Sequence, residues 1–309
     1  MFSTATVVAA IDDTLEAEET LRAARTMLAK DVPSVLHVLH VVEELPPAVQ
    51  RYLFPYACLG DDHDAVVADI LSASRGSLLE RFGESTKLDE RFLRVVYGRV
   101  IDAAMEELRR TGPDLVVVGS SSSEVPEPGL IGKNAARLIR RSPAPVLVVR
   151  GRRRESIQKI VVALDMGQDA PGLFSSAIIF AHTHGAQVTP VHVVSSLPAA
   201  ASGRTRGADA GSRKELDRRF QQVLSSLKLP YPVQTVATDI VQKPRLEEGD
   251  VGEGIVAAAR ELEADMVVVY RCESSALSGA RLGRVTEYVL RHSPCDVLVL
   301  PPPVRHESE

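Results

Sequence analysis

The chain has 309 residues, enough for two ordinary domains, of which 45% are hydrophobic and 25% are charged. This composition is typical of a globular protein in water. The net charge of −5 at pH 7 argues against a protein dedicated to nucleic acids or to membrane surfaces, so we expect neither partner.

The cysteines and the N-terminus favour a cytoplasmic protein. Cys58, Cys272 and Cys295 lack the spacing of a zinc site or a disulfide framework, so we expect no metal site and a reducing compartment. The first residues, MFSTATVVAAIDDT, have no basic segment, and we expect no signal peptide. The stretch 170–203 has no Asp, Glu, Lys or Arg, but prolines and glycines interrupt it, so it predicts a buried helix and strand rather than a membrane span.

Short apolar, β-branched runs alternate with helical patterns along the chain. In the first half we predict strands near 6–11, 35–42, 92–97, 115–119 and 146–149, and helices near 15–30, 62–82, 100–111 and 132–141. In the second half we predict strands near 159–164, 188–194, 233–239, 266–270 and 297–300. Strands that are apolar on both faces and alternate with helices predict an α/β fold with a parallel, helix-covered sheet.

Two helix starts carry recognisable capping residues. Asp13, followed three residues later by Glu16, predicts a capping box before the first helix. Asp169, ahead of Pro171, predicts the N-cap of the first helix in the second half.

The two halves are copies of one unit. "GKNAARLIRRSPAPVLVV" from Gly132 aligns with "GRVTEYVLRHSPCDVLVL" from Gly283, and the same offset of 151 residues aligns "DLVVV" with "DMVVV". "VVAAID" and "LHVV" in the first half match "VVALD" and "VHVV" in the second. We predict domains at 1–150 and 157–303, a basic linker at 150–156 and a tail at 304–309. The linker charge is interpreted as solvated, and a nucleic-acid contact is the less favoured alternative.

The segments "VVAAIDDT", "RLIRRSPAPVLVV" and "TEYVLRHSPCDVLVL" resemble the universal stress proteins in their tandem two-domain form, over almost the whole chain. The resemblance implies two doubly wound, Rossmann-like domains of the adenine nucleotide alpha hydrolase-like kind, with five strands each. It implies that "PVLVVR" and "DVLVLP" pair antiparallel within the chain, and that tandem chains form a homodimer.

ATP-binding members of that family carry a loop of the form G-x₂-G-x₉-G-[ST] and an aspartate after the first strand. Small residues let backbone amides reach the phosphates. The first half keeps the loop spacing, with a serine at the middle glycine and a lysine at the hydroxyl position, while Pro126 and Pro128 stiffen the loop. The candidate ATP-contacting residues of the first domain are Asp12, Val41, Gly119, Ser122, Gly132 and Lys133.

The second half keeps the spacing but has Tyr270 and Glu273 at the first two glycine positions. A glutamate there adds negative charge beside phosphate, so this half predicts the weaker site. Its candidate residues are Asp165, Gly283, Arg284 and Thr286. For Asp12 and Asp165 an alternative remains, in which each carboxylate only orients the following turn.

Other motifs have structural interpretations. "EEGDVGEG" (247–254) is interpreted as a strand-to-helix turn, and "HTHG" (182–185) as a helix C-terminus. His40 and His192 are interpreted as histidines satisfied by the backbone. No P-loop, nucleophile elbow or HExxH motif occurs, so we predict no catalytic residue.

The sequence therefore predicts a cytoplasmic stress-response protein, not an enzyme, with ATP as the possible ligand of its first domain. The alternative is an interaction module that binds no nucleotide and acts through an unknown protein partner. A slow ATPase is the third hypothesis.

Overall fold

Each half of the chain forms five strands that alternate with helices. The computed structural model describes residues 4–14, 16–29, 32–44, 62–120, 131–150, 156–167, 169–195, 210–231, 233–271 and 282–302. The first half contains β1 (Thr6–Ile11), α1 (Glu16–Met27), β2 (Val35–Glu43), α3 (Asp62–Thr86), the short 3₁₀ helix η2 (Glu90–Phe92), β3 (Leu93–Gly98), α4 (Val100–Thr111), β4 (Leu115–Gly119), α5 (Lys133–Arg141) and β5 (Val146–Val149).

The second half repeats this order within the described residues, with an α-helix, α8, in the place of η2. It contains β6 (Lys159–Ala163), α6 (Ala170–His184), β7 (Gln187–Ser195), α7 (Ala210–Ser225), α8 (Val233–Ile240), β8 (Arg245–Gly249), α9 (Val251–Glu261), β9 (Met266–Tyr270), α10 (Arg284–His292) and β10 (Asp296–Leu300).

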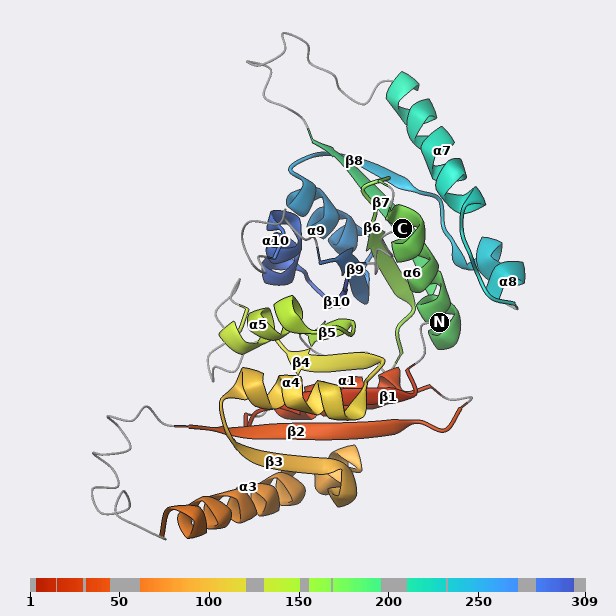
Figure 1. Ribbon diagram of the computed structural model, residues 1–309. Helices are drawn as coiled ribbons and strands as arrows, with labels where there is room; N and C mark the ends of the chain where they lie inside the picture. The colour runs from red at the N-terminus through yellow and green to blue at the C-terminus, as the bar shows by residue number, and fades with distance from the viewer. Residues whose placement is uncertain are drawn as a thin grey trace, which may run out of the picture.

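The strands form one continuous sheet in the order β3-β2-β1-β4-β5-β10-β9-β6-β7-β8 (Figure 1). Pairing within each half is parallel, whereas β5 and β10 pair antiparallel, with Leu147 opposite Leu298. The predicted doubly wound fold and the predicted pairing of the two last strands within the chain are confirmed. The two halves are thereby related like the subunits of a dimer.

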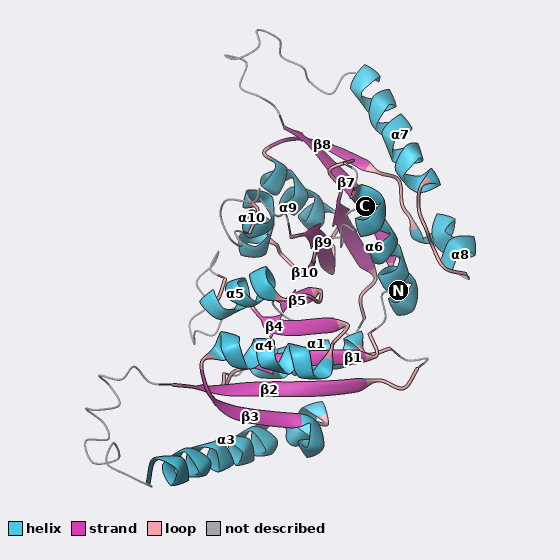
Figure 2. Ribbon diagram, viewed as in Figure 1, coloured by secondary structure: helices cyan, strands magenta, loops and turns pink. Residues whose placement is uncertain are grey.

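Helices cover both faces of the sheet (Figure 2). Each face has its own hydrophobic core. Residues of α1, α3, α6, α7 and α8 pack into one core, and residues of α4, α5, α9 and α10 into the other. The strands supply both cores because their alternate side chains point to opposite faces. This is why the strand sequences are apolar throughout.

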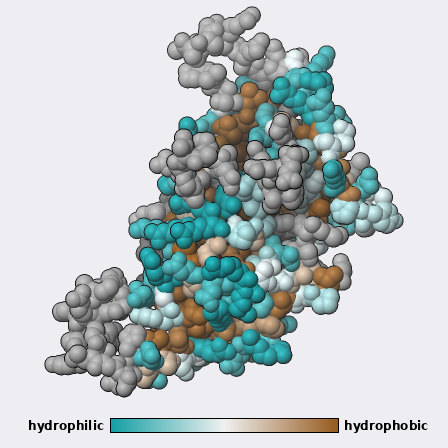
Figure 3. Space-filling view, in the orientation of Figure 1, coloured by the Kyte–Doolittle hydropathy of each residue, from teal (hydrophilic) through white to brown (hydrophobic). Residues whose placement is uncertain are grey.

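Several helices are amphipathic, as this layered arrangement favours. Helix α5, for example, buries Ala135, Ala136, Leu138 and Ile139 and exposes Lys133, Arg137 and Arg141. Figure 3 shows the consequence, with teal hydrophilic side chains over much of the viewed face and brown hydrophobic ones between them in the lower half. The polar stripe of each helix faces water while its apolar stripe covers the sheet.

The repeated Ser-Pro and Asp-Leu/Met motifs have repeated structural roles. Ser142 and Ser293 follow α5 and α10, and each Oγ donates to a carbonyl two residues on, at 2.7 Å to Ala144 O and 2.9 Å to Cys295 O. The Asp114 Oδ2 atom accepts from the Thr6 backbone amide at 2.9 Å, at the start of β1. Asp265 Oδ2 accepts from the Lys159 amide at the same distance, at the start of β6. The two halves therefore keep the same residue types at positions where these side chains hold helix ends and strand starts.

The strand predicted near 233–239 is wrong, because these residues form helix α8. The β-branched run "VQTVATDI" favours a strand by propensity, but Val233, Ala237 and Ile240 have helical spacing and pack against the core beside α6. The edge strand of the second half is instead β8, "RLEEG", which is charged and pairs on one side with β7. A strand at the edge of a sheet tolerates such charged residues.

The predicted helix starts are partly confirmed. Asp169 is the N-cap of α6, although its side chain makes no capping hydrogen bond. Before α1, the carboxylate that holds the turn belongs to Asp12 rather than to Asp13, because Asp12 Oδ1 accepts from the backbone N and the Oγ1 of Thr14 at 3.1 and 2.6 Å. Since α1 begins at Glu16, its N-cap position is residue 15, which lies outside the described residues, so the predicted capping role of Asp13 stays a prediction.

Candidate functional site

A pocket opens in the first domain where the carboxyl ends of β1, β2 and β4 meet α1, α4 and α5. Between β1 and β4 the strand order reverses, and in doubly wound sheets such a reversal leaves a crevice above the strand ends. The pocket encloses about 120 Å³ of space that the centres of water molecules can reach. Its lining residues are Ala10, Ile11, Asp12, Glu16, Ala17, Thr20, Leu39, Val41, Val100, Ile101, Ala104, Val118, Gly119, Gly132, Asn134, Ala135 and Leu138.

The N-terminus of α5 forms one wall of this pocket. Gly132 is the N-cap residue, has no side chain and makes no side-chain capping bond, while Asn134 and Ala135 of the first turn line the pocket. First-turn amides of a helix have no partner within the helix and carry the positive end of its dipole. This wall of the pocket therefore suits an anion.

The opposite side of the pocket is acidic. Asp12 follows β1 and Glu16 begins α1, and both line the pocket. The Asp12 carboxylate is oriented by its two hydrogen bonds from Thr14, so the alternative turn role of Asp12 is observed. A carboxylate held in this way can also accept a hydrogen bond from a hydroxyl or amino group of a ligand.

The structure brings together most of the residues predicted for the first domain. Asp12, Val41, Gly119 and Gly132 line the same pocket. Lys133 is exposed at the start of α5 and is not part of the lining. Ser122 and the two loop prolines lie outside the described residues.

The sequence analysis missed the contribution of α4 to the pocket. Val100, Ile101 and Ala104 form a wall that the loop motif does not include. They are apolar residues at ordinary core spacing on a helix, so nothing in the pattern separates them from core residues.

In the second domain, Tyr270 occupies the equivalent position to Gly119, at the end of β9. Its ring packs against the core, and its hydroxyl lies 3.1 Å from the place where a β-carbon on Gly172, in the first turn of α6, would be. Burial, followed by the negative charges of Asp169 and Asp165, raises the pKa of Tyr270 to about 12. The tyrosine side chain thus lies across the strand-end crevice that is open in the first domain.

The remaining second-domain candidates have structural roles or are exposed. Thr286 is buried, and its Oγ1 donates to the carbonyl of Tyr270 at 2.8 Å. Asp165 is exposed and its Oδ1 accepts from the Gly167 amide at 2.8 Å, as expected for a turn. Gly283 is the N-cap of α10, and Arg284 is exposed. Of the second-domain positions considered, Tyr270 is the one whose ring packs against the core and whose hydroxyl reaches the first turn of α6.

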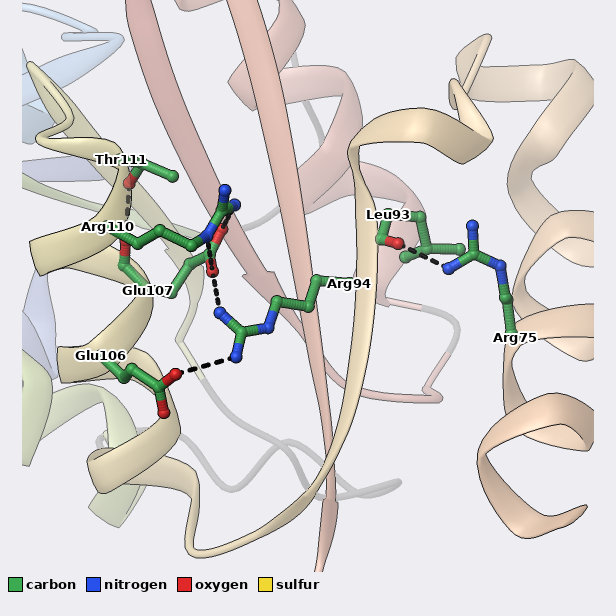
Figure 4. Close-up of polar contacts among 7 residues, drawn as sticks. All are labelled: Arg75, Leu93, Arg94, Glu106, Glu107, Arg110 and Thr111. Atoms are coloured by element: carbon green, nitrogen blue, oxygen red, sulfur yellow. Dashed lines mark hydrogen bonds and ion pairs between the residues drawn. The ribbon is translucent and has the colours of Figure 1, made fainter. Parts of the chain in front are cut away.

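A second polar cluster lies outside the lining of the pocket, between β3 and α4. Glu107 is buried, with a side chain 1% exposed, and accepts from Arg94 at 2.9 Å and from Arg110 at 2.6 Å (Figure 4). Arg94 also donates to the exposed Glu106 at 3.0 Å. Burial alone would raise the pKa of Glu107, but the bonds from Arg110 and Arg94 outweigh it, and the pKa lies below its ordinary value. An acid stabilised in its charged form between two arginines is suited to structural support.

The histidines singled out in the sequence are satisfied by the backbone. The Nδ1 atom of His40 lies 3.1 Å from the Ile11 carbonyl, and that of His192 lies 2.7 Å from the Leu164 carbonyl. "HTHG" ends α6, with Gly185 in the left-handed conformation at φ 66°. "EEGDVGEG" is the turn from β8 into α9, capped by Asp250. These four interpretations are confirmed.

The described residues contain neither a membrane-spanning helix nor a cluster of metal ligands. None of the helices within them is long and apolar enough to cross a membrane. Across the same ranges, no group of three or more His, Cys, Asp or Glu side chains is arranged to hold a metal ion.

Comparisons with known proteins place the fold in a family. The model of the universal stress protein family matches the chain twice, at residues 4–150 and 156–301. Universal stress protein E of Escherichia coli K12 is 25% identical over 224 residues, which cover 67% of each chain. A relative from Staphylococcus epidermidis is 29% identical over 149 residues, covering 47% of this chain and 84% of its own.

A solved structure extends the likeness in fold to the whole chain. A universal stress protein from Archaeoglobus fulgidus covers 98% of this chain and 98% of its own, with a TM-score of 0.64 and 15% sequence identity. Two matches of one family model and a shared tandem fold lead to one conclusion: the chain belongs to the universal stress protein family and contains two copies of its domain.

Proposed function

We propose that this protein serves a stress response by binding an adenine nucleotide, with ATP as the expected ligand, in the pocket of its first domain. The observation that carries the proposal is the convergence of Asp12, Val41, Gly119 and Gly132 on one pocket. These residues come from three strand ends and one helix start, and the resemblance to the family implied them as ATP contacts.

The chemistry of the walls suits the parts of such a ligand. Val41, Ile101 and Leu138 offer an apolar surface for a purine base. Asp12 offers a hydrogen-bond acceptor for a ribose hydroxyl. The first-turn amides of α5 suit phosphate oxygens, and the exposed Lys133 adds positive charge at the same helix end.

The proposal is for one nucleotide per chain, bound without turnover. Tyr270 lies across the equivalent crevice of the second domain, where Gly119 leaves the first open. Titration calorimetry gives the number of sites, and phosphate release from the same sample tests for turnover.

A matched pair of variants tests the location of the site. Gly132 and Gly283 are the N-caps of α5 and α10, with φ of −54° and −58°, so glutamate fits either backbone without strain. Gly132→Glu places a carboxylate beside the phosphates, and we expect it to weaken ATP binding by about tenfold or more, which corresponds to roughly 1.4 kcal/mol. Gly283→Glu is expected to bind ATP as the wild type does.

The outcomes distinguish nucleotide binding in the first domain from an interaction module that binds no nucleotide. Equal loss of binding in both variants would contradict the location, provided that circular dichroism shows both to be folded. No heat from the wild type at millimolar ATP would refute nucleotide binding and favour an interaction module that acts through a protein partner.

A further inference from the structure

The two domains exchange arginines across the seam between β5 and β10. Arg271 directly follows β9 in the second domain, and its Nη1 donates to the carbonyls of Ile139 and Ser142, at 2.7 and 2.8 Å, at the C-terminus of α5. Arg150 directly follows β5 in the first domain, and its guanidinium donates to the carbonyls of Leu290 and Arg291 at the C-terminus of α10. Each domain therefore caps a helix of the other.

These arginines make the favourable contact that a helix C-terminus offers. The last carbonyls of a helix have no partner within it and form the negative end of its dipole, which a guanidinium satisfies. Ile139 and Ser142 are 1% and 0% exposed, so the carbonyls that Arg271 reaches belong to residues fixed in the core.

Helix α5 joins this interdomain contact to the pocket. Its first turn, with Gly132, Asn134 and Ala135, lines the pocket, and its last turn accepts the bonds from Arg271. The helix has nine residues, which is about 13 Å at 1.5 Å per residue. Because its apolar stripe is buried in the core, a displacement at one end moves the other as one body.

We propose that Arg271 is a positioning residue, through which the second domain sets the placement of the phosphate-binding end of α5. Nucleotide binding in the first domain is then coupled to the contact with the second domain, and the coupling is reciprocal. This inference rests on the proposed nucleotide site. It assigns to the second domain, whose own crevice is crossed by Tyr270, a role in nucleotide binding by the first domain.

Arg150 provides the matched control. It makes the same type of contact with α10, whose first turn bonds Tyr270 of the second domain through Thr286 and does not line the pocket. Loss of Arg150 disturbs the same seam, but it leaves α5 and the pocket in place.

The experiment compares Arg271→Gln, Arg271→Lys and Arg150→Gln in the full-length protein. ATP affinity is measured by calorimetry, and amide hydrogen exchange of α5 and α10 is measured without ATP. We expect Arg271→Gln to weaken ATP binding about fivefold or more and to speed exchange in α5. Arg150→Gln should speed exchange in α10. It should change ATP affinity by less than about twofold, which is smaller than the roughly fivefold effect at which coupling between sites typically begins. Arg271→Lys, which retains a cationic donor, should recover most of the affinity.

Each result decides the matter. If the wild type binds ATP and Arg271→Gln binds it with the same affinity, the coupling is overturned and the proposed nucleotide site is retained. An equal loss in Arg271→Gln and Arg150→Gln assigns the effect to general loosening of the seam, which also overturns it. No ATP binding by the wild type overturns the nucleotide site and the coupling together. Should Arg271→Gln fail to fold, the wild type tests the reciprocal effect: coupling predicts that ATP slows amide exchange at the end of β9 in the second domain, and unchanged exchange there overturns it.

Discussion

Gly119 and Tyr270 occupy equivalent positions at the strand-end crevices of the two domains. The first repeat has Gly119 at the end of β4, and the second has Tyr270 at the end of β9, 151 residues later. Glycine leaves room above the sheet, whereas the tyrosine ring packs on the core and its hydroxyl reaches the first turn of α6. The two repeats share the same order of strands around this position, so the residue here affects what the crevice can admit.

The tyrosine also stabilises its domain, which a substitution can measure. Tyr270→Ala removes a half-buried ring, and we expect it to lower the free energy of unfolding by roughly 1–3 kcal/mol, less than for a fully buried aromatic residue. Tyr231 is 83% exposed, so Tyr231→Ala should change stability by less than about 0.5 kcal/mol. Urea denaturation measures both, and equal effects would show that the ring of Tyr270 makes no stabilising contact.

The buried carboxylate of α4 permits a second test at this scale. Glu107→Gln leaves Arg94 and Arg110 without their charged partner, and we expect a loss of about 1–3 kcal/mol, limited because both arginines are partly exposed. Glu106 also bonds Arg94 but is 60% exposed, so Glu106→Gln should cost less than about 0.5 kcal/mol. Chemical denaturation at neutral pH compares the two, and a larger effect of Glu106→Gln would contradict the assignment.

The same residue predicts a dependence of stability on pH. The pKa of Glu107 in the folded protein lies below the ordinary value of 4.5, so its contribution is complete above that pH and is lost as pH falls through the folded pKa. Between pH 4.5 and the folded pKa, the free energy of unfolding should therefore fall less steeply in Glu107→Gln than in the wild type. Parallel curves for the two proteins would exclude this carboxylate as a source of the acid sensitivity.

At the scale of elements, packing between helices decides whether a glycine can be replaced by a larger residue. Helix α9 lies against α10, and in its first turn Gly252 faces the ring of Tyr288. A β-carbon on Gly252 would lie 2.6 Å from Tyr288 Cδ1, closer than such contacts occur. In α3, by contrast, Gly76 is exposed and a β-carbon there would have no atom within 4 Å.

Alanine substitutions at these two glycines should therefore have opposite signs. Gly252→Ala is expected to destabilise the protein by roughly 1–3 kcal/mol, because the ring or the helix must move. Gly76→Ala is expected to stabilise it by about 0.5–1 kcal/mol, because alanine loses less backbone entropy within a helix. Thermal and urea denaturation measure both changes, and effects of the same sign would mean that helix propensity alone governs these positions.

At the scale of the whole molecule, the seam between β5 and β10 joins the two domains into one sheet. Leu147 and Leu298 face each other across it and are 0% and 1% exposed. The seam also carries the reciprocal arginine contacts with α5 and α10. We expect the domains to unfold as one cooperative unit.

Truncation at the seam tests that expectation. Leu298→Ala should cost about 2–5 kcal/mol, as usual for a buried leucine, and should raise hydrogen exchange in strands of both domains together. Val194 is 42% exposed near the end of β7, and Val194→Ala should cost less than about 0.5 kcal/mol. Faster exchange confined to the second domain would show that the domains unfold separately.

The sequence by itself determined the alternation of strands and helices, the repeat, the antiparallel seam implied by the family resemblance, and four pocket residues. Periodicity and residue spacing are local properties, and they carry the alternation and the repeat along the chain, whereas the seam and the four pocket residues were implied by the resemblance to the family. Only the tertiary structure decided that residues 233–240 form a helix, because packing of Val233, Ala237 and Ile240 overrides their β propensity. It also decided that α4 lines the pocket, that Tyr270 crosses the second crevice and that Arg271 caps α5. Each of these depends on contacts between residues distant in the chain, which no local pattern records.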